Sequence, residues 1–377
     1  MTKIILVANT EWYLYNFRLS LASYLRQQGY EVALISPPGR FTARLEQAGF
    51  RWIAWGLGRK TLAPWKELAS LLALAQLYRR ERPHLVHHHT IKPVLYGSLA
   101  ARLAGIPAVV NSITGRGYLF MRDTRTAHFL RWLLRPWYHA AFSPANCAVI
   151  FENVDDRRYF LDARLVYPER TWLIEGVGVD PEIFSPLPEP EGTPVILLAA
   201  RLLWDKGIGT LVEAARRLKP RTSARLVLVG EPDPGNPASI ETATLQAWVD
   251  EGLVEWWGWQ EDMPSVYARC HIVVLPSLGE GAPTALLEAA ACGRPLVTTD
   301  VPGCRDVVED GVNGFIVPPN DPAALAAALE KLVLSPALRG RMGAAGRQRV
   351  LAHFTTSHVN ARTLNVYQQI WKSAQKP

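Results

Sequence analysis

Glu280 and Glu288 are separated by seven residues in the segment 277–297, which is otherwise mostly small and apolar. Glycines on both sides of Glu280 predict a turn in which the backbone can approach a ligand closely. Pro283 suits the first position of a helix, so Glu288 is expected one turn later, on the same helix face as Thr284. Because carboxylates accept hydrogen bonds from pairs of hydroxyl groups, the pattern predicts a site for a ligand that carries sugar hydroxyls.

The first turn of this predicted helix is also a candidate anion site. The N–H groups of Thr284, Ala285 and Leu286 are expected to be free, and such groups bind phosphate at a helix N-terminus. A diphosphate bound there would have a nucleoside toward Glu288 and a second group toward Glu280, which is the order of a nucleotide sugar. A solvated helix residue and an ordinary turn acid are the alternative interpretation. Three turn residues precede the free N–H groups at the same site: Gly281, Ala282 and Pro283.

A basic turn forms a second candidate site. Arg201 and Lys206 follow the apolar run 194–200, which predicts a buried strand. At the carboxyl end of a parallel strand, two cations can balance a diphosphate and hold it as a leaving group during transfer. A solvated basic turn is the alternative interpretation. The two candidate sites together favour a nucleotide-sugar ligand more strongly than either does alone.

Short apolar runs alternate with helical patterns along the chain, and this alternation is typical of parallel sheets covered by helices. Each half of the chain repeats the alternation, so two α/β units are expected. Open parallel sheets bind ligands at the carboxyl ends of their strands, and both candidate sites fit that edge of the second sheet. The predicted strands begin at Lys3, Glu31, Arg51, His84 and Ala108 in the first half and at Pro194, Ala224, Val254, His271, Pro295 and Gly314 in the second.

The segment 178–194 is rich in Pro, Gly and Glu and lacks apolar periodicity, as expected of a linker. The sequence therefore predicts a Rossmann-like N-terminal domain over 1–186 and a Rossmann-like C-terminal domain over 187–356. The site is expected in the cleft between them. The last helical pattern, 357–377, is expected to pack back on the first domain.

Composition and charge exclude several classes of protein. The 377 residues are 49% hydrophobic and 20% charged, which is ordinary for a globular protein. The four cysteines form no C-x-x-C pair, and neither a basic-then-apolar leader nor a long uncharged apolar stretch occurs. We therefore expect a cytoplasmic protein that does not span a membrane. The net charge of +7 favours acidic partners such as nucleic acid, anionic lipid or a phosphate-bearing ligand.

Two kinds of cofactor are disfavoured. A nicotinamide enzyme needs G-x-G-x-x-G after its first strand, whereas this first strand leads into NTEWYLYNF. His87, His88 and His89 suggest a metal site, but successive side chains of a strand point to opposite faces and cannot all reach one ion. We therefore expect no metal and no cofactor. A histidine near an acceptor substrate and a plain loop histidine are the remaining interpretations of this triplet.

Several motifs together resemble those of the retaining glycosyltransferases of family 4, which have the GT-B fold. ARLLWDKG, LVLVGEPD and the run from VEWWGWQ to GFIVPP extend the resemblance over nearly the whole second domain. The first domain is similar less sharply, through YNFRLSLASYLRQQGYEVALISP, HHHTIKPVLYGSLAARLAGIP and VIFENVDDRRYF. These segments are most similar to members that extend lipid-diphosphate-linked oligosaccharides for surface polysaccharides or glycans.

The resemblance implies a role for each candidate residue of the second domain. Arg201 and Lys206 would bind the diphosphate of the donor. Glu288 would bind the ribose, and Glu280, with the backbone after it, the donor sugar. The candidate catalytic residues are then Arg201, Lys206 and Glu280.

The resemblance also implies the donor and the course of the reaction. A UDP-sugar is the expected donor, with its base bound by backbone groups near Trp259 and Gln260. Transfer with retention is expected without a metal, by a front-face displacement in which the leaving phosphate helps to deprotonate the acceptor hydroxyl.

The first domain is expected to bind the acceptor, a lipid-linked saccharide. It departs from the pattern of the relatives at two places. NTEWYLYNF replaces a Gly-rich turn, and Thr114 stands where many relatives have a histidine near the donor sugar. The candidate acceptor or cleft residues are Asn16, Arg18, His89, Lys92, Thr114 and Gly115.

A basic and aromatic stretch, 116–142, predicts contact with an anionic membrane surface. If TAHFLRWLLRPWYHAAF is helical, its arginines and aromatic rings suit the interface of a bilayer. The alternative is a helix packed in the first domain with solvated arginines. Because a lipid-diphosphate acceptor stays in the membrane, we expect peripheral association with the inner face of the cell membrane. The arginines are Arg116, Arg122, Arg125, Arg131 and Arg135.

Three other functions fit parts of the pattern. A nonhydrolysing UDP-sugar epimerase shares the architecture, but it needs catalytic acids of its own. A noncatalytic partner subunit is disfavoured by the intact motif. A nucleic-acid-binding protein fits the charge, but no recognised binding module is present in the sequence, and we expect no nucleic acid partner.

Overall fold

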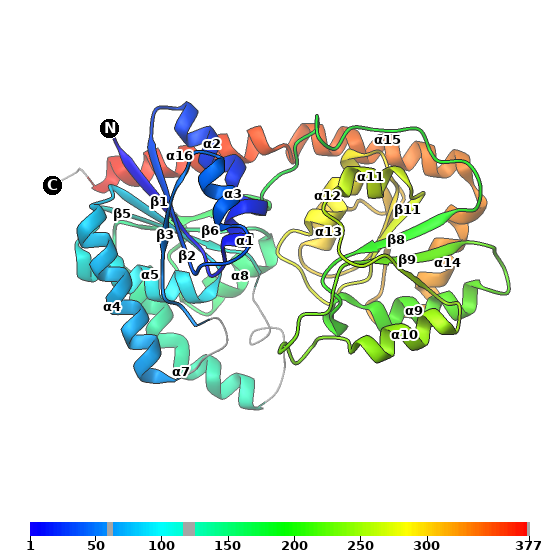
Figure 1. Cartoon of the computed structure of the whole chain (residues 1–377), viewed down its shortest axis with the longest axis horizontal. Coiled ribbons are helices and arrows are strands. Elements are labelled where there is room, and N and C mark those ends of the chain that lie inside the picture. The colour runs from blue at the N-terminus through cyan, green and yellow to red at the C-terminus, as the bar shows by residue number, and fades with distance from the viewer. Residues whose placement is uncertain (59–62, 116–124, 375–377) are drawn as a thin grey trace. The chain divides into compact units, whose positions relative to one another are not determined.

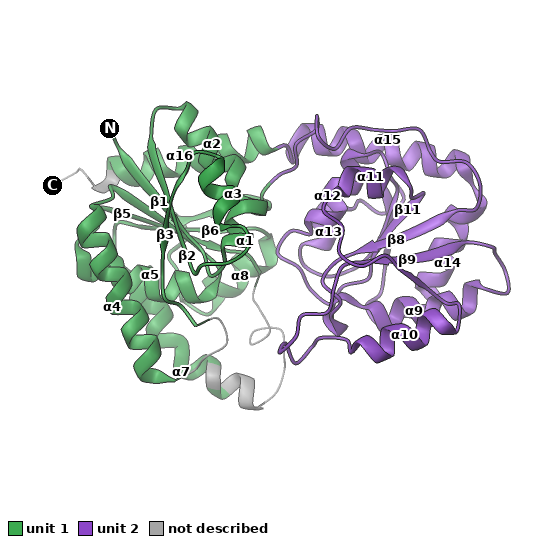
Figure 2. Cartoon of the chain, in the orientation of Figure 1, with its two compact units in different colours: residues 1–177, 356–377 green, residues 178–355 purple. Residues whose placement is uncertain are grey.

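The structure, a computed structural model, describes residues 1–58, 63–115 and 125–374 (Figure 1). It divides into two compact units, which are residues 1–177 with 356–377 and residues 178–355 (Figure 2). Each unit is built on one parallel β-sheet, with seven strands in unit 1 and six in unit 2. The prediction of two Rossmann-like parallel-sheet units is confirmed.

The sheet of unit 1 has the strand order β3-β2-β1-β4-β5-β6-β7, with all neighbours parallel. Its strands read as apolar runs because helices cover both faces. The strand order reverses between β1 and β4, and ligands bind such sheets beside that reversal. The strands are β1 (Lys3–Val7), β2 (Glu31–Ser36), β3 (Arg51–Ala54), β4 (Leu85–His89), β5 (Ala108–Ile113), β6 (Cys147–Phe151) and β7 (Thr171–Leu173). The last two were not among the predicted strands.

Helices bury apolar side chains on both faces of this sheet. On one face, α4, α5 and α7 contribute Leu74, Val94 and Phe142 to one core. On the other, α2 and α16 contribute Leu25 and Tyr367, and these two helices lie side by side (Figure 1). The helices are α1 (Glu11–Tyr13), a π-helical turn (Leu14–Arg18), α2 (Leu19–Gln27), α3 (Thr42–Gln47), α4 (Pro64–Glu81), α5 (Ile91–Ala104), α7 (Arg125–Phe142), α8 (Val154–Asp162), a 3₁₀ turn (Pro168–Arg170) and α16 (Thr356–Ala374).

The C-terminal helix α16 belongs to unit 1, whereas the segment 178–186 belongs to unit 2. Hydrogen bonds explain the second assignment. The N–H of Val179 donates to the carbonyl of Phe354 at 2.8 Å, and Arg347 donates to the carbonyl of Phe184 at 2.7 Å. The division therefore falls at residue 178, earlier than the boundary expected at 186.

The sheet of unit 2 has the order β10-β9-β8-β11-β12-β13 and is also parallel throughout. All six strands predicted in this half are present, each beginning within one residue of the expected position. The strands are β8 (Val195–Ala199), β9 (Arg225–Val229), β10 (Glu255–Trp256), β11 (Ile272–Leu275), β12 (Leu296–Thr299) and β13 (Gly314–Val317). The helices are a 3₁₀ turn (Trp204–Lys206), α9 (Ile208–Leu218), α10 (Thr242–Asp250), α11 (Met263–Ala268), α12 (Thr284–Ala291), α13 (Cys304–Val307), α14 (Pro322–Leu334) and α15 (Pro336–His353).

The four cysteines of the chain are all buried and carry free thiols. Burial raises the pKa of each thiol to about 12, so none is a reactive thiolate at neutral pH. Within the described residues, we find no helix that combines the length and the apolar character needed to cross a membrane.

Candidate functional site

Two loops of unit 2 are bound to each other at the carboxyl ends of neighbouring strands. β8 pairs with β11, so the loops that follow them emerge side by side. The carbonyl of Asp205, in the first loop, accepts hydrogen bonds from the N–H of Leu278 at 2.9 Å and the hydroxyl of Ser277 at 3.1 Å, both in the second. Gly207 permits this approach, because a Cβ there would lie 1.8 Å from the carbonyl oxygen of Pro276. The backbone thus fixes the basic turn against the turn that carries the first glutamate.

This contact between loops brings Lys206 and Glu280 together. Nζ of Lys206 lies 2.5 Å from Oε1 of Glu280, and both side chains are largely buried. The N–H of Glu280 donates to the carbonyl of Pro302 at 3.2 Å. Gly303, at φ 79°, leaves no room for a side chain, since a Cβ would lie 2.5 Å from the carbonyl oxygen of Gly281. The residues expected to hold a diphosphate and a sugar are therefore in direct contact.

Arg201, the second predicted cation, is also paired with an acid. Its Nη1 lies 3.0 Å from Oδ2 of Asp233, in the loop after β9, and its side chain is 52% exposed. Sequence reasoning missed Asp233, because a single acid after a strand resembles an ordinary loop residue. In addition to Lys206 and Glu280, Arg201 and Asp233 form a second cation–carboxylate pair at this edge of the sheet. Both cations that the sequence predicted are therefore already paired with a carboxylate.

The start of α12 differs from the prediction in two details. Pro283 is the N-cap residue rather than the first residue of the helix, which begins at Thr284. The N–H of Leu286 donates to the carbonyl of Pro283 at 3.0 Å, so it is not free as expected. This bond tightens the first turn, as is common at helix ends. Among the described residues, no hydrogen-bond acceptor contacts the N–H groups of Thr284 and Ala285, the other two groups predicted to be free.

Glu288 lies on α12 with its carboxyl against Tyr267 of α11. The hydroxyl of Tyr267 lies 2.9 Å from Oε2 of Glu288 and 3.2 Å from the carbonyl of Ala285, and can donate to either. Burial raises the pKa of the Glu288 carboxyl to about 7, although the hydrogen bond from Tyr267 lowers it. The carboxyl is therefore poised to gain or lose a proton near neutral pH. Sequence reasoning missed Tyr267, which precedes the predicted strand by a few residues.

Trp259 and Gln260 follow β10, at the same edge of the unit 2 sheet. The side-chain amide of Gln260 donates to the carbonyl of Trp257 at 2.7 Å, which shapes this loop. The guanidinium of Arg269 stacks 4.0 Å from the ring centre of Trp257. The ring of Trp259 is partly exposed.

In unit 1, the carboxyl ends of β1, β4 and β6 hold a polar cluster of Tyr13, Arg18, His89 and Glu152, of which the last three are buried. Arg18 donates from Nη2 to the hydroxyl of Tyr13 at 2.8 Å and lies 3.5 Å from Oε1 of Glu152. The rings of Tyr13 and His89 are 5.7 Å apart. Two predicted residues, Arg18 and His89, thus belong to one cluster. Tyr13 and Glu152 were missed, and prediction of β6 would have placed Glu152 at this edge.

The three histidines of β4 have different surroundings. His87 contacts the hydroxyl groups of Tyr367 at 2.6 Å and Ser112 at 2.7 Å. His88, on the opposite face, contacts the hydroxyl of Tyr78 at 2.9 Å. Burial lowers the pKa of His88 to about 4 and those of the other two well below the ordinary value. In the part of the chain that the structure describes, no three His, Cys, Asp or Glu side chains are grouped so as to hold a metal ion.

The other four acceptor candidates are not members of the polar cluster. Lys92, at the start of α5, donates to Oε1 of Glu67 on α4 at 2.9 Å, so it forms an ion pair between two helices. Asn16 is exposed. Thr114 and Gly115 follow β5 and are partly exposed. Of the six candidates, Arg18 and His89 are the two in the polar cluster.

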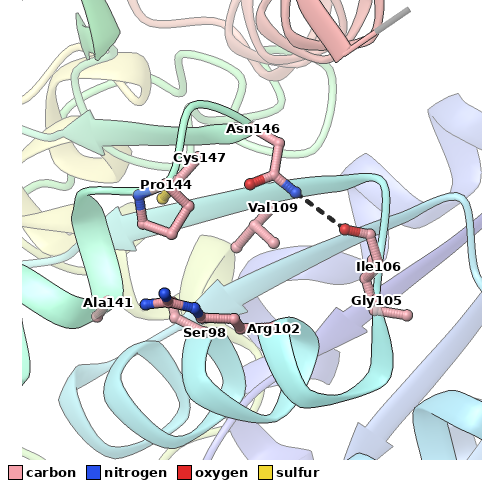
Figure 3. Close-up of a pocket in the computed structure, with 9 residues that line it drawn as sticks. All are labelled: Ser98, Arg102, Gly105, Ile106, Val109, Ala141, Pro144, Asn146 and Cys147. Carbon is pink, nitrogen blue, oxygen red and sulfur yellow. Dashed lines mark hydrogen bonds between the residues drawn. The ribbon is translucent and has the colours of Figure 1, made fainter.

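A cavity of about 310 Å³ opens at the opposite edge of the unit 1 sheet. It lies at the amino ends of β5 and β6, where the side-chain amide of Asn146 donates to the carbonyl of Ile106 at 2.9 Å (Figure 3). Because ligands of parallel sheets bind at the carboxyl ends of the strands, this cavity is separate from the candidate sites. It is lined by Ser98, Arg102, Gly105, Ile106, Val109, Ala141, Pro144, Asn146 and Cys147.

Two family models match the chain. The model described as "Glycosyl transferases group 1" matches residues 193–335, and the model described as "Glycosyl transferase 4-like" matches residues 3–153. The first match includes the contact between Lys206 and Glu280. The second match includes all four residues of the polar cluster of unit 1.

The chain is also similar to curated enzymes. It is 27% identical over 373 residues, 96% of each chain, to the N,N'-diacetylbacillosaminyl-diphospho-undecaprenol alpha-1,3-N-acetylgalactosaminyltransferase of Campylobacter jejuni. It is 27% identical over 270 residues, 68% of each chain, to the UDP-Gal:alpha-D-GlcNAc-diphosphoundecaprenol alpha-1,3-galactosyltransferase of Escherichia coli. Both names describe transfer of a sugar to a saccharide linked to undecaprenol through a diphosphate.

Solved structures share the fold. A glycosyltransferase from Rickettsia africae has a TM-score of 0.81 at 19% identity, covering 98% of this chain and 99% of its own. Anabaena HepE, solved in complex with UDP and glucose, has a TM-score of 0.79 at 19% identity, covering 98% of this chain and 100% of its own. At this level of identity, the likeness shows the fold alone.

Proposed function

Because the chain belongs to the group 1 and 4-like glycosyltransferases and has the GT-B fold, we propose that it is a retaining hexosyltransferase that moves a sugar from a UDP-sugar to a lipid-diphosphate-linked saccharide. The observation that carries this proposal is the pair of Lys206 and Glu280, held by the bound loops after β8 and β11. A cation and a carboxylate at one edge suit a ligand that combines a charged diphosphate with a neutral sugar.

The diphosphate of the donor binds Lys206 and the start of α12. The N–H groups of Thr284 and Ala285 add two donors at a helix terminus that favours negative charge. As the diphosphate takes over the contact with Lys206, the carboxylate of Glu280 is released to accept hydrogen bonds from the hydroxyls of the donor sugar. Arg201 adds positive charge from a more exposed position.

Transfer takes place on one face of the donor sugar. The bond from the anomeric carbon to the diphosphate oxygen breaks, the acceptor oxygen bonds to the same face, and the hydroxyl proton passes to the departing phosphate. Negative charge grows on the leaving diphosphate, so its contact with Lys206 strengthens in the transition state and lowers the barrier. This front-face course follows from the resemblance to retaining family 4 enzymes, and Glu280 orients the sugar rather than attacking it.

The nucleoside binds on the far side of the diphosphate. Tyr267 can donate to one oxygen of the Glu288 carboxylate, and the second oxygen can accept from the ribose hydroxyls. The base lies near Trp259 and Gln260, at the edge strand of the same sheet. Uridine is supported by the name of the Escherichia coli relative, which specifies UDP-Gal, and by the UDP bound to HepE.

Unit 1 binds the acceptor in this proposal. The names of the two curated relatives support a saccharide on a lipid diphosphate as the acceptor class. The residues proposed to line the acceptor site are Asn16, Arg18, His89, Lys92, Thr114 and Gly115, and neither a metal nor a cofactor is proposed there.

Two helices of unit 1 support docking on an anionic membrane surface. On α7, Trp132 is 68% exposed, and Phe129, Leu133 and Trp137 are also exposed. On α4, which packs with α7 against α5, Trp65 is 72% exposed (Figure 1). Exposed aromatic rings beside cations favour the interface of a bilayer.

The charges on these helices also suit an anionic surface. α7 contains no acidic residue, and the two glutamates of α4, Glu67 and Glu81, are not exposed. Arg131 and Arg135 reach back to α8, where they donate to the hydroxyl of Tyr159 at 3.5 Å and the carbonyl of Ala163 at 3.3 Å. Arg116 and Arg122 lie outside the described residues, as does the side chain of Arg125. The protein is proposed to act at the inner face of the cell membrane.

The test is transfer by the purified protein. UDP-galactose, UDP-N-acetylgalactosamine and UDP-glucose are each offered with α-D-GlcNAc-diphosphoundecaprenol and with N,N'-diacetylbacillosaminyl-diphospho-undecaprenol. We expect one pair to give a product whose anomeric configuration, measured by NMR, matches that of the donor. An inverted product contradicts retention, and absence of transfer from every donor contradicts the proposed function.

A further inference from the structure

Three residues at the carboxyl-end edge of the unit 1 sheet have buried polar atoms with no partner among the described residues. These atoms are Nε of Arg18, both ring nitrogens of His89 and the hydroxyl oxygen of Thr90. Arg18 is 5% exposed and His89 is 0% exposed. Native proteins keep few unpaired buried polar groups because each costs free energy. Several at one edge therefore indicate a site that a further molecule completes.

The backbone at this edge is unusual at two points. Thr90 has φ 71° and ψ 157°, a region that glycine normally occupies and that other residues adopt mainly at ligand sites. Residues Leu14–Arg18 form a π-helical turn, and such turns are rare and concentrate at functional sites. Both features lie next to the unpaired atoms.

The π-helical turn aligns Arg18 with Tyr13, five residues earlier. Nη2 of Arg18 donates to the hydroxyl of Tyr13 at 2.8 Å and lies 3.5 Å from Oε1 of Glu152, which is itself buried. The carboxylate balances the buried guanidinium. Because Nη2 makes both contacts, they hold the guanidinium in place and leave the hydrogen of Nε for another acceptor.

The unpaired groups match the chemistry of sugar hydroxyls. Burial, with the nearby His87 and Arg18, lowers the pKa of His89 well below its ordinary value, so the ring is neutral and has one donor and one acceptor nitrogen. The hydroxyl of Thr90 can donate and accept. A sugar hydroxyl also does both, whereas a phosphate only accepts and would leave the acceptor nitrogen of His89 unpaired.

We propose that Arg18, His89 and Thr90 bind hydroxyl groups of the acceptor saccharide, and that Glu152 and Tyr13 are positioning residues that act through Arg18. This inference rests on the proposed function and assigns to this edge the sugar of the acceptor rather than its diphosphate. Because Arg18 and His89 are buried, the proposal requires the side chains that pack over them to move when the saccharide binds.

The test compares Glu152→Gln and Tyr13→Phe with Glu81→Gln. Glu81 is a matched control, since it is a buried acid of the same unit, with Oε2 2.9 Å from Nζ of Lys3 and 2.8 Å from Nη1 of Arg51, at the opposite edge of the sheet. The kinetics use the donor and acceptor that the wild type accepts, each varied separately. We expect the first two variants to raise the acceptor KM by about tenfold or more, as loss of a hydrogen bond to a charged group does.

Three further readouts separate positioning from general damage. The donor KM and the slow hydrolysis of the UDP-sugar without acceptor should stay as in the wild type, and Glu81→Gln should leave the acceptor KM unchanged. Thermal unfolding checks that each variant is folded. If Glu152→Gln does not fold, the acceptor KM of His89→Asn tests the proposal instead. An unchanged acceptor KM in the folded variants overturns this inference alone. A wild type that transfers no sugar overturns the proposed function and this inference with it.

Discussion

The carboxyl-end edges of the two sheets satisfy their charged groups in opposite ways. In unit 2, Lys206 and Arg201 each contact a carboxylate, and Arg201 reaches solvent. In unit 1, the buried Arg18 lies against Glu152 and keeps an unpaired donor beside a neutral histidine. Paired cations can exchange a carboxylate for a phosphate, whereas unpaired groups gain hydrogen bonds from a neutral ligand. The same sheet topology can therefore present one edge to a charged donor and another to an uncharged saccharide.

The largest change in activity is expected from substitutions at the carboxyl-end edge of the unit 2 sheet. Lys206→Ala should lower kcat by about two to three decades, because a contact to the leaving diphosphate that strengthens in the transition state is worth several kcal/mol. Arg201→Ala should cost less, since its side chain is more exposed. Lys219→Ala, at the far end of α9, is the control. Steady-state kinetics measure the effect, and a near-wild-type kcat in Lys206→Ala contradicts the donor assignment.

The second prediction concerns a surface on unit 1. Replacing Trp65 and Trp132 by serine should weaken sedimentation with anionic liposomes by about tenfold or more, because two large rings leave the bilayer interface. Transfer to a lipid-linked acceptor should fall, and transfer to a short soluble acceptor should not. Leu334→Ser, which changes an exposed residue of unit 2, is the control.

Charge reversal sharpens the membrane prediction. Changing Arg125, Arg131 and Arg135 to glutamate should act in the same direction, and raised salt should weaken binding of the wild type. Equal loss on soluble and lipid-linked acceptors, or no binding to liposomes at low salt, contradicts membrane docking and leaves the donor site untouched.

The third prediction uses the titration of Glu288. An ionised carboxylate accepts more hydrogen bonds from ribose than a protonated one, so the donor KM should rise as the pH falls below about 7, by up to about tenfold per unit. Glu288→Gln should bind the donor more weakly and lose this pH dependence. Glu213→Gln, on the exposed face of α9, is the control. If the donor KM of Glu288→Gln depends on pH as in the wild type, the carboxyl of Glu288 does not contact the donor.

The stability of the protein should also depend on the titration of Glu288, but in the opposite direction: lower pH weakens donor binding and stabilises the fold. Burial raises the Glu288 pKa from 4.5 to about 7, so between these values the folded protein binds more protons than the unfolded chain. The free energy of unfolding should therefore fall as the pH rises through this window, by at most about 3 kcal/mol. Urea unfolding at several pH values measures it. Glu288→Gln should remove that component, and an unaltered profile contradicts the raised pKa.

The smallest expected effect is that of EDTA. The positive charge proposed to face the diphosphate comes from the side chains of Lys206 and Arg201, so chelation should change the initial rate by less than about twofold. Complete loss of activity, restored by Mg²⁺ or Mn²⁺, contradicts this prediction. It would mean that a metal ion, and not only side-chain cations, balances the diphosphate at the unit 2 edge.

The unit 2 candidates could be predicted because their signals are local. Glu280 lies in the turn and Glu288 in the helix of one continuous strand–turn–helix segment. The glycines beside Glu280 indicate the turn, and Pro283 indicates the start of the helix. The start of α12 was predicted less accurately. The N–H of Leu286 is not free because it donates to the carbonyl of Pro283. The turn that precedes α12 also packs against Gly303, which belongs to another loop.

The partners of the predicted residues could not be predicted from the sequence. Asp233 and Tyr267 lie far from Arg201 and Glu288 along the chain, and neither has a local pattern that distinguishes it from other polar residues. In unit 1, Tyr13 and Glu152 meet at Arg18 only because β1 and β6 lie in one sheet with the π-helical turn beside them.

The sequence alone was enough to predict two parallel sheets, the order of the unit 2 strands along the chain, and the turn that holds each candidate donor residue. Apolar periodicity, glycine and proline are sufficient for this, because they act over a few residues. Tertiary structure alone decided which charges meet, which polar groups stay unpaired and how far the carboxyl of Glu288 is buried. These properties depend on desolvation and distance in space, and both are set when strands far apart in the sequence become neighbours.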